Sequence, residues 1–499
     1  MAISRRQFLR RSALGAAAMT LGPRLRWLPG TGVGWAACAG DAIVVFVQLG
    51  GGNDGINTVY PIAGPERAKY ETFRPTLKLP KNGGEFDPDF VAQLGNASVL
   101  SLGTNPNGSD YALHPAMSAL HGVWTAGRLA VVTGVHYPFA DHSHFRSEVI
   151  WYTADPLGTG GQGWFGRFLD HGGCFGATDV PGVVLGGDLT PMFTPTGTSL
   201  LAFRRLSELR FPASGDVAAK QAAFQALYDA SNDVDPALFP ELVALGNTGV
   251  AAVQKMQDYY LSGGAVGKVE ALLVDAEGGY DADNDLVYPS PLNPSTNPLL
   301  AGNDLARDLK HVAATIRADV GARFFHVQTG GFDSHSQQER GFYHSFLLQG
   351  VSEAVAAFHG EVSQSVTLPG GYTGYQTGDV SPRVVVVVFS EFGRTIRQNA
   401  PGINAGTDHA APSVVLVTGG AVAGGQYGAY PLLDDPGEND DDLRMTFDFR
   451  DVFGTVLTRH LGVAEADVGP GPGKILPATP EVDPLGNSYT SFTPIPFLP

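Results

Sequence analysis

Residue types that bind metal ions follow three strongly apolar segments of the chain. Asp54 ends the segment AIVVFVQLGGGND, Asp333 and His335 end FFHVQTGGFDSH, and Glu391 ends VVVVVFSE. Such apolar segments are typical of buried strands, and in an open parallel sheet ligands gather beyond the carboxyl ends of the strands, where the loops converge. Carboxylates and imidazoles at that edge predict an active site with a divalent metal ion.

Asp333 and His335 are the sharpest of these signals. Side chains two residues apart on an extended segment point the same way, so both can bind one ion, and a carboxylate with an imidazole suits zinc, manganese or iron. In the alternative interpretation Asp333 caps a following helix and His335 is an exposed polar residue. His326, inside the same apolar segment, is expected to face the core or to be hydrogen-bonded.

Asp54 and Glu391 each leave two interpretations open. Flexible glycines after a strand let Asp54 approach an ion closely, whereas in a plain tight turn Asn53 and Asp54 would hydrogen-bond to their own backbone. Glu391 is expected either near a cation or in an ion pair with Arg394.

Asp408 and His409 precede a further apolar segment that starts near Val414. We expect the loop that carries them to return to the same edge of the sheet. His409 is the better candidate ligand, because histidine binds metals more often than aspartate does, and the alternative for both residues is a structural role.

The segment from Asp141 to Arg146, DHSHFR, supplies a candidate nucleophile. Ser143 precedes a segment with helical character, and a hydroxyl at a helix start can be activated by a metal or a neighbouring base. Arg146 would stabilise an anionic group under attack. The alternative is that Ser143 is a helix N-cap, with the neighbouring histidines polar at the surface or hydrogen-bonded in the core.

The first 39 residues resemble a twin-arginine export signal. Ser4-Arg5-Arg6-Gln7-Phe8 precedes a short apolar stretch that is about half of the roughly 20 residues needed to cross a bilayer. We therefore expect cleavage after Ala39, periplasmic or extracellular localisation, the Tat machinery as a partner, and no permanent membrane span. Lipid anchoring at Cys38 is the alternative.

Charge makes nucleic acid an unlikely kind of partner. The chain has 32 basic and 49 acidic residues; without the six arginines of the leader the balance is 26 minus 49, or −23. Binding to phosphate backbones needs clustered lysine and arginine, and the sequence has no basic stripe. Of the two cysteines only Cys174 remains after cleavage, so no disulfide is expected within the chain.

The order of elements favours one α/β domain. Further strands are predicted at 129–135, 180–185, 324–328, 384–389 and 414–417, and helices at 114–126, 304–320 and 341–358. The domain is expected at 40–480 with a helical insertion at about 200–300, followed by a Pro-rich tail at 481–499. The whole Pro- and Gly-rich segment after Gly469 is expected to wrap the surface rather than add to the core.

Seven motifs carry a resemblance to a known family: GGNDGINT, RPTLKLP, LHPAM, SHFRS, GGFDSH, SEFGRT and TDHAAP occur in this order between Ala42 and Leu461. In this the chain resembles domain-of-unknown-function family 1501. The resemblance implies an alkaline phosphatase-like three-layer sandwich, with a mainly parallel central sheet flanked by helices and one or two metals at its carboxyl edge.

The resemblance also implies roles for single residues. Asp54 is the acid after the first strand, Ser143 the nucleophile, Asp333 and His335 the next ligand pair, Glu391 the following acid, and His409 the last ligand. The alkaline phosphatase and sulfatase superfamily, to which the resemblance relates the chain, usually has Asp-His where Ser390-Glu391 stands here. One metal, or two held asymmetrically, is therefore expected. An ordinary sulfatase is disfavoured, because His144-Phe145-Arg146 lacks the proline that follows the sulfatase nucleophile.

Two functional hypotheses follow. The first is an exported hydrolase of a phosphate or related anionic ester, with Ser143 and Arg146 as catalytic residues and a divalent ion, whether zinc, manganese, iron, calcium or magnesium, on Asp54, Asp333, His335, Glu391 and His409. The second is a non-catalytic exported binding or assembly protein that retains the fold.

Overall fold

The computed structural model of the chain describes residues 41–499 apart from 82, 95–97, 158–160, 171–181, 186–189, 194–200, 204–302, 320, 340–341, 366–375 and 472. The predicted leader, Cys174 and nearly all of the predicted helical insertion lie outside these residues. Within the described part, no helix has the length and apolar character that a membrane span requires.

A nine-stranded sheet forms the centre of the described fold, in the order β13-β5-β12-β9-β1-β8-β6-β7, with β14 also paired to β5. Its strands are β1 (Ile43–Leu49), β5 (Leu129–His136), β6 (Gly182–Leu185), β7 (Leu201–Phe203), β8 (Phe324–Thr329), β9 (Val384–Phe389), β12 (Ser413–Gly419), β13 (Gly425–Tyr427) and β14 (Phe447–Asp448). Every described pair in it is parallel except the two pairs that β12 makes. The sheet is mainly parallel, as the sequence predicted.

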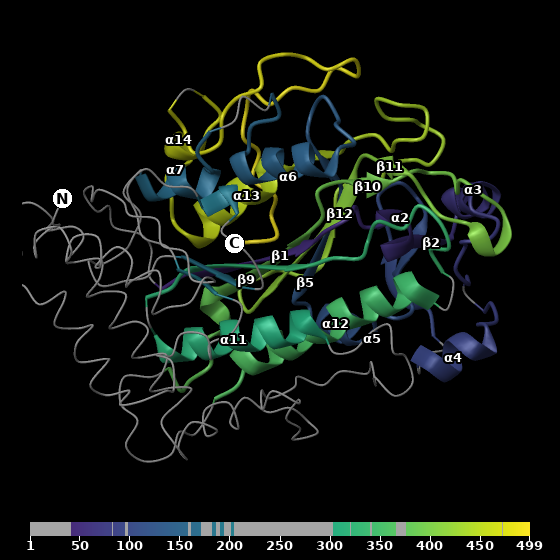
Figure 1. The fold of residues 1–499 in the computed structure, drawn as a ribbon, viewed down its shortest axis with the longest axis horizontal. Helices are drawn as coiled ribbons and strands as arrows, with labels where there is room; N and C mark the ends of the chain where they lie inside the picture. The colour runs from purple at the N-terminus through teal and green to yellow at the C-terminus, as the bar shows by residue number, and fades with distance from the viewer. Residues whose placement is uncertain are drawn as a thin grey trace, which may run out of the picture.

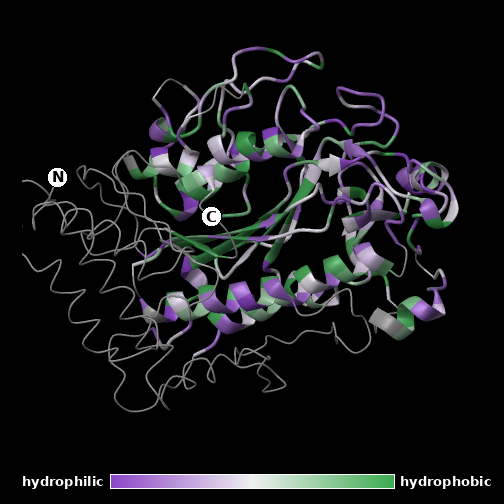
Figure 2. Ribbon diagram, viewed as in Figure 1, coloured by the Kyte–Doolittle hydropathy of each residue, from purple (hydrophilic) through white to green (hydrophobic). Residues whose placement is uncertain are grey.

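Helices cover both faces of this sheet (Figure 1). One core contains the inward side chains of α5 (Ser118–Thr125), α11 (Asp304–Ala318) and α12 (Tyr343–Val362), and the other those of α6 (His144–Thr153), α7 (Trp164–Asp170), α13 (Phe449–Thr455) and α14 (Glu465–Val468). Alternate residues of β1 enter the two cores, which is why its sequence is apolar apart from Gln48. The strands are accordingly the most hydrophobic part of the ribbon in Figure 2.

The antiparallel direction of β12 explains how His409 reaches the site. Because β12 runs against β9 and β5, its first residue, Ser413, lies at the edge where those two strands end. The preceding residues His409 and Ala410 form β11, which pairs with β10 (Gly393–Arg394) just after β9. The loop before β12 therefore returns to the carboxyl edge, as expected from the sequence.

The first hundred residues of the domain are more elaborate than the βαβ-like opening that the sequence suggested. A separate antiparallel sheet of β2 (Val59–Ala63), β4 (Asp110–Leu113) and β3 (Leu100–Thr104) lies between β1 and α5 in the chain, together with the short helices α2 (Gly55–Thr58), α3 (Pro65–Phe73) and α4 (Pro88–Leu94). In the main sheet β9 and β12 separate β1 from β5. Alternation in these short strands is too brief to predict them reliably.

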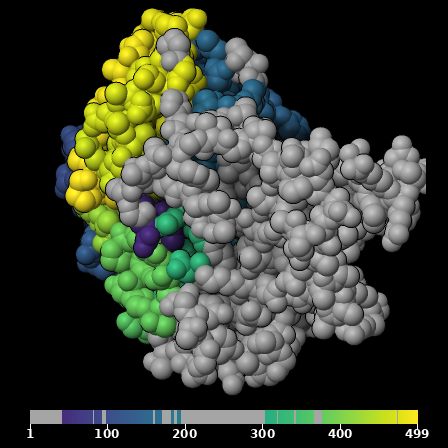
Figure 3. Space-filling model, turned by 90° about the vertical axis from the view of Figure 1, so that its left-hand side faces the viewer, coloured from purple at the N-terminus to yellow at the C-terminus, as the bar shows by residue number. Residues whose placement is uncertain are grey.

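The segment after Gly469 corrects one expectation. It was expected to wrap the surface, yet Ile475, Leu476, Tyr489 and Phe497 are fully buried in the core that α6, α7 and α13 share. Arg167 Nε of α7 donates to the carbonyl of Ile475 at 2.8 Å. Figure 3 shows this yellow C-terminal segment beside blue residues of the chain's second quarter. Proline and glycine set its irregular backbone without excluding its apolar side chains from the core.

The remaining described elements are short turns: η1 (Pro191–Phe193), η5 (Ser381–Arg383), η6 (Gly402–Asn404) and the π-helical η7 (Val456–His460), which continues α13.

Candidate metal centre

Four side chains from three separate segments meet at the carboxyl edge of the sheet. His144 is the first residue of α6, Asp333 and His335 follow β8, and His409 begins β11. His335 Nε2 and His409 Nε2 each lie 3.1 Å from Asp333 Oδ1, and they lie 2.8 Å from each other. His144 Nε2 lies 3.6 Å from the same carboxylate oxygen. Three of the predicted ligands thus meet, together with a histidine that had not been predicted as one.

The other nitrogen of each imidazole donates a hydrogen bond away from this centre. His144 Nδ1 donates to Glu391 Oε1 at 2.8 Å, His335 Nδ1 to Asp408 Oδ1 at 2.9 Å, and His409 Nδ1 to the carbonyl of His142 at 2.7 Å. These partners only accept hydrogen bonds, so each neutral imidazole carries its proton on Nδ1. All three Nε2 lone pairs therefore point at Asp333.

This arrangement places four acceptor atoms together with no hydrogen between them. His144 Nε2 is a buried atom without a hydrogen-bond partner in the described structure. Two ligand atoms at about 2.0–2.1 Å from one tetrahedral zinc ion lie about 3.3–3.4 Å apart, and the four separations here, 2.8–3.6 Å, bracket that value. The ligand atoms of His144, Asp333 and His409 all lie within 4.8 Å of one another and could hold one divalent ion, with His335 Nε2 adjoining Asp333 and His409.

Solvent reaches the four side chains. Asp333 is 48% exposed, His335 45%, His144 28% and His409 20%. Structural zinc sites are usually closed, whereas catalytic sites keep a position open for water or substrate. The exposure of these four side chains resembles that of sites with an open position for water or substrate.

Arg394 fixes the charge of Asp333 from beneath. Its fully buried guanidinium donates to Asp333 Oδ1 at 2.8 Å and also to the carbonyls of Gly51 and Gly52. Burial raises the pKa of Asp333, but the hydrogen bond and the charge of Arg394 oppose it, and the pKa is lowered to about 2. Asp333 is therefore an anion at neutral pH. Arg394 pairs with Asp333 rather than with Glu391, which was the sequence alternative.

Glu391 has a different role from the predicted one of metal ligand. It is buried, and its Oε1 accepts both His144 Nδ1–H and the amide of Gly51, each at 2.8 Å, while Oε2 lies 3.0 Å from Ser390 Oγ. The hydrogen bond that His144 donates to Glu391 raises the pKa of His144. Glu391 thus orients a ligand imidazole, as carboxylates behind metal-bound histidines commonly do.

Asp54 is also displaced from its predicted role as a ligand. Its Oδ2 lies 2.6 Å from Arg74 Nη1 and 2.6 Å from Gln338 Nε2, and Oδ1 accepts the amide of Asn57 to cap α2. Burial raises the pKa of Asp54, but the charge and hydrogen bond of Arg74 outweigh burial and lower it overall. Both carboxylate oxygens of Asp54 therefore have hydrogen-bond partners within the protein. The bond to its neighbouring backbone is close to the tight turn that was the alternative interpretation of the sequence.

The two glycines before Asn53 allow this loop to approach the centre closely. Gly51 has φ of +116°, and a Cβ there would lie 2.5 Å from the amide nitrogen of Asp333. Gly52 has φ of +72°, and a Cβ there would lie 2.3 Å from the ring of Phe392. The motif therefore supports the ligands from behind instead of binding an ion.

Ser143 and Arg146 lie at the rim. Ser143 is the exposed N-cap residue of α6, one position before the ligand His144, and its hydroxyl makes no capping hydrogen bond. Arg146 Nε lies 3.0 Å from Asp141 Oδ2, and its side chain is 47% exposed. The structure places both residues beside the centre on α6, with Arg146 already paired to an acid.

The sequence did not reveal His144 as a candidate ligand, nor that Glu391 would accept a hydrogen bond from His144 and Asp408 one from His335. The segment DHSHFR was predicted to belong to the site, but through Ser143 as a candidate nucleophile and not through His144. A histidine at the first turn of a helix after a buried strand was the available signal.

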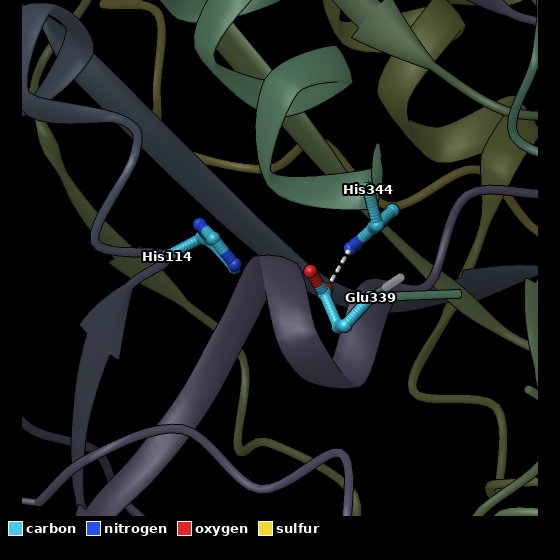
Figure 4. A group of neighbouring side chains, drawn as sticks. All are labelled: His114, Glu339 and His344. Carbon is cyan, nitrogen blue, oxygen red and sulfur yellow. Dashed lines mark ion pairs between the residues drawn. The ribbon is translucent and has the colours of Figure 1, made fainter. Parts of the chain in front are cut away.

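A second group of possible ligands, His114, Glu339 and His344, lies in the interior (Figure 4). His344 Nδ1 lies 3.4 Å from Glu339 Oε1, and both histidines are fully buried. The amide of Ala116 donates to His114 Nδ1, so the proton of neutral His114 is on Nε2, which faces Ser345 Oγ at 3.4 Å. Burial lowers the pKa of His114 well below its ordinary value, which keeps it neutral. His114 thus directs a hydrogen, not a lone pair, into this group.

Residues 307–464 match the model of a family described as Protein of unknown function (DUF1501). The matched segment contains Asp333, His335, Glu391 and His409. Asp54 and His144 precede it in the chain. No curated protein and no solved structure matches the chain.

Proposed function

We propose, starting from the match of residues 307–464 to the DUF1501 family model, that the chain is a metal-dependent hydrolase of a phosphate or related ester. The observation that carries the proposal is the convergence of three Nε2 lone pairs on the carboxylate of Asp333. Three nitrogens and one oxygen favour zinc, manganese or iron over calcium and magnesium, which prefer oxygen ligands.

His144, Asp333, His335 and His409 would hold the ion. Once bound, it would polarise the ester and lower the pKa of a hydroxyl near it. Glu391, Asp408 and the carbonyl of His142 keep the three imidazoles in the tautomer that binding requires. Arg394 keeps Asp333 ionised without reaching the solvent itself.

Ser143 is the proposed nucleophile. It lies at the amino end of α6, where the helix dipole favours an anionic group, and its hydroxyl has no capping bond to give up. Its Oγ would attack the phosphorus or sulfur atom and form a covalent ester as the alcohol leaves, and water would then release the acid. Arg146 would turn from Asp141 to the substrate anion.

Export and fold family belong to the same proposal. We propose that residues 1–39 direct the protein to the Tat machinery and that it works in the periplasm or outside the cell. The mainly parallel sheet with helices on both faces and ligands at its carboxyl edge supports an alkaline phosphatase-like arrangement.

The test combines metal analysis with a substrate panel of aryl phosphate, phosphodiester and aryl sulfate. The wild type should contain about one ion per chain and turn over at least one ester. Asp333→Ala should lose the ion and activity; Ser143→Ala should keep the ion and lose at least ~100-fold in kcat. Exposed Asp304→Ala and Ser118→Ala are matched controls, because Ser118 also begins a helix. A metal-free wild type, or unchanged turnover in Ser143→Ala and Asp333→Ala, would contradict the proposal.

A second candidate is a non-catalytic exported binding protein that retains one metal. The observation in its favour is that the Ser143 side chain makes no capping hydrogen bond and no base is seen to contact it among the described residues. A stoichiometric ion together with no turnover of any ester would support this candidate.

A further inference from the structure

His344 connects the interior group to the metal centre through hydrogen bonds. Its Nε2 lies 3.2 Å from Asn53 Oδ1, and Asn53 is oriented by its own Nδ2, which donates to Thr58 Oγ1 at 2.9 Å. The Thr58 hydroxyl in turn donates to the carbonyl of Asp54. Oδ1 of Asn53 is therefore the acceptor, and His344 Nε2 carries a hydrogen.

From Asn53 the chain of contacts continues to a metal ligand. The amide of Asn53 donates to Ser390 Oγ at 2.9 Å, and the Ser390 hydroxyl lies 2.6 Å from the carbonyl of Leu49 and 3.0 Å from Glu391 Oε2, which share its one hydrogen. The other oxygen of Glu391 accepts the Nδ1 hydrogen of His144. Asn53 and Ser390 thus lie between the buried imidazole of His344 and Glu391, whose carboxylate orients His144.

His344 also packs behind the ligand Asp333. Its ring meets the ring of Phe332 edge to face, with centroids 6.2 Å apart, and Phe332 immediately precedes Asp333. The amide of His344 donates to the carbonyl of Gln338, whose side chain binds Asp54 and accepts Thr407 Oγ1. His344 therefore contacts Phe332 through its ring and Gln338 through its backbone amide, and these two residues adjoin the two loops that carry candidate ligands.

The other side of His344 faces Glu339. Its Nδ1 lies 3.4 Å from Glu339 Oε1, and neither atom has a hydrogen-bond partner among the described residues. Glu339 Oε2 already accepts from Ser345 Oγ at 2.9 Å. Glu339 and Asn53 therefore hold the His344 ring from its two nitrogens.

We infer that His344 is a positioning residue of the metal centre, held by Glu339 and acting through Asn53, Ser390 and Glu391, and that no second ion occupies the interior group. His114 supports this arrangement through Ser345 and lends no ligand atom. The inference rests on the proposed metal centre but not on hydrolysis. Removing an outer partner of a metal ligand typically costs 10–100-fold in metal affinity, and two residues separate His344 from the outer partner Glu391, so we expect the low end of that range, about 10-fold.

The test measures Co²⁺ binding by competition with a chelator, Co²⁺ stoichiometry, and the visible absorption of the bound Co²⁺, which reports ligand geometry. His344→Ala should bind one Co²⁺ per chain about 10-fold more weakly, with a shifted spectrum. His344→Gln, whose amide can still donate to Asn53, should recover most of the affinity and the wild-type spectrum. It also serves if the alanine variant does not fold.

His326→Ala is the matched control, since His326 is an equally buried imidazole on β8 whose Nε2 contacts Gln48 instead. It should leave the Co²⁺ affinity and spectrum unchanged even if it lowers the melting temperature. Unchanged affinity in both His344 variants would overturn the inference, and so would two Co²⁺ in the wild type and one in His344→Ala. A wild type that binds no Co²⁺ would overturn the metal centre itself.

Discussion

Two groups of histidines and acids in this protein have similar compositions but opposite hydrogen-bond patterns. At the sheet edge, His144, His335 and His409 all direct lone pairs at Asp333, because carboxylates or a carbonyl take their Nδ1 hydrogens. In the interior, His114 and His344 direct their assigned Nε2 hydrogens at Ser345 and Asn53. The partner of the second ring nitrogen decides which group presents ligands.

The two groups also differ in how far their side chains are buried. The edge group is 20–48% exposed, so an ion there remains accessible, whereas both interior histidines are fully buried. The comparison teaches that clustering of ligand-type residues is a weak criterion by itself. Tautomer and exposure together separate a site that can do chemistry from one that supports it.

The largest expected effect comes from removing an edge ligand. His335→Ala should reduce the bound metal from about one ion per chain to a small fraction of that, because one of four ligand atoms is lost. Elemental analysis of the purified protein measures this. His121→Ala, which removes a histidine whose Nε2 contacts the carbonyl of Ser101 on β3, should retain the ion. Equal metal in both variants would end the distinction between the two groups.

Asp54→Asn tests whether Asp54, which the sequence predicted as a metal ligand, instead stabilises the fold through its ion pair with Arg74. Breaking a fully buried ion pair by removing one partner typically costs about 3–5 kcal/mol, because Arg74 is left uncompensated. Urea unfolding should show a loss of that size, while the folded variant still binds one ion. Loss of metal without loss of stability would restore Asp54 as a ligand.

The same pair predicts a pH dependence. The folded-state pKa of Asp54 is lowered below its ordinary value of 3.8, so its stabilising contribution is complete above that value and is lost as pH falls through the folded pKa. The difference in unfolding free energy between wild type and Asp54→Asn should therefore be constant near neutral pH and shrink below about pH 4. A difference that grows on acidification would contradict this assignment.

Glu391→Gln should have an intermediate effect on the edge group alone. Glutamine can still accept one hydrogen bond from His144 but lacks the charge that favours that tautomer, so metal affinity should fall about 10–100-fold with the stoichiometry unchanged. Chelator competition measures it. Complete loss of the ion would make Glu391 a direct ligand.

The sequence anticipated the strands and the edge where their polar ends meet, because buried parallel strands are apolar throughout and end in loops that converge. Asp333, His335 and His409 were predicted for this reason, and they do meet. Asp54 and Glu391 end similar strands, yet Arg74 and His144 reach them from distant parts of the chain. Partners so remote leave no local pattern, which is also why His144 was missed.

Arg146→Ala should give the smallest change. Its pair with Asp141 is exposed at the surface, and such pairs contribute about 0–1 kcal/mol, so the unfolding free energy should change by less than ~1 kcal/mol and the metal content not at all. A rise in KM for an ester substrate would identify Arg146 as its anion contact. An unchanged KM would remove Arg146 from the proposed mechanism.

Anomalous diffraction from crystals of the protein with its natural metal tests the central claim most directly. We predict one strong peak at about 2.0–2.2 Å from His144 Nε2, Asp333 Oδ1, His335 Nε2 and His409 Nε2, with no peak between His344 and Glu339. A peak in the interior group, or density showing the edge group with water alone, would contradict the account.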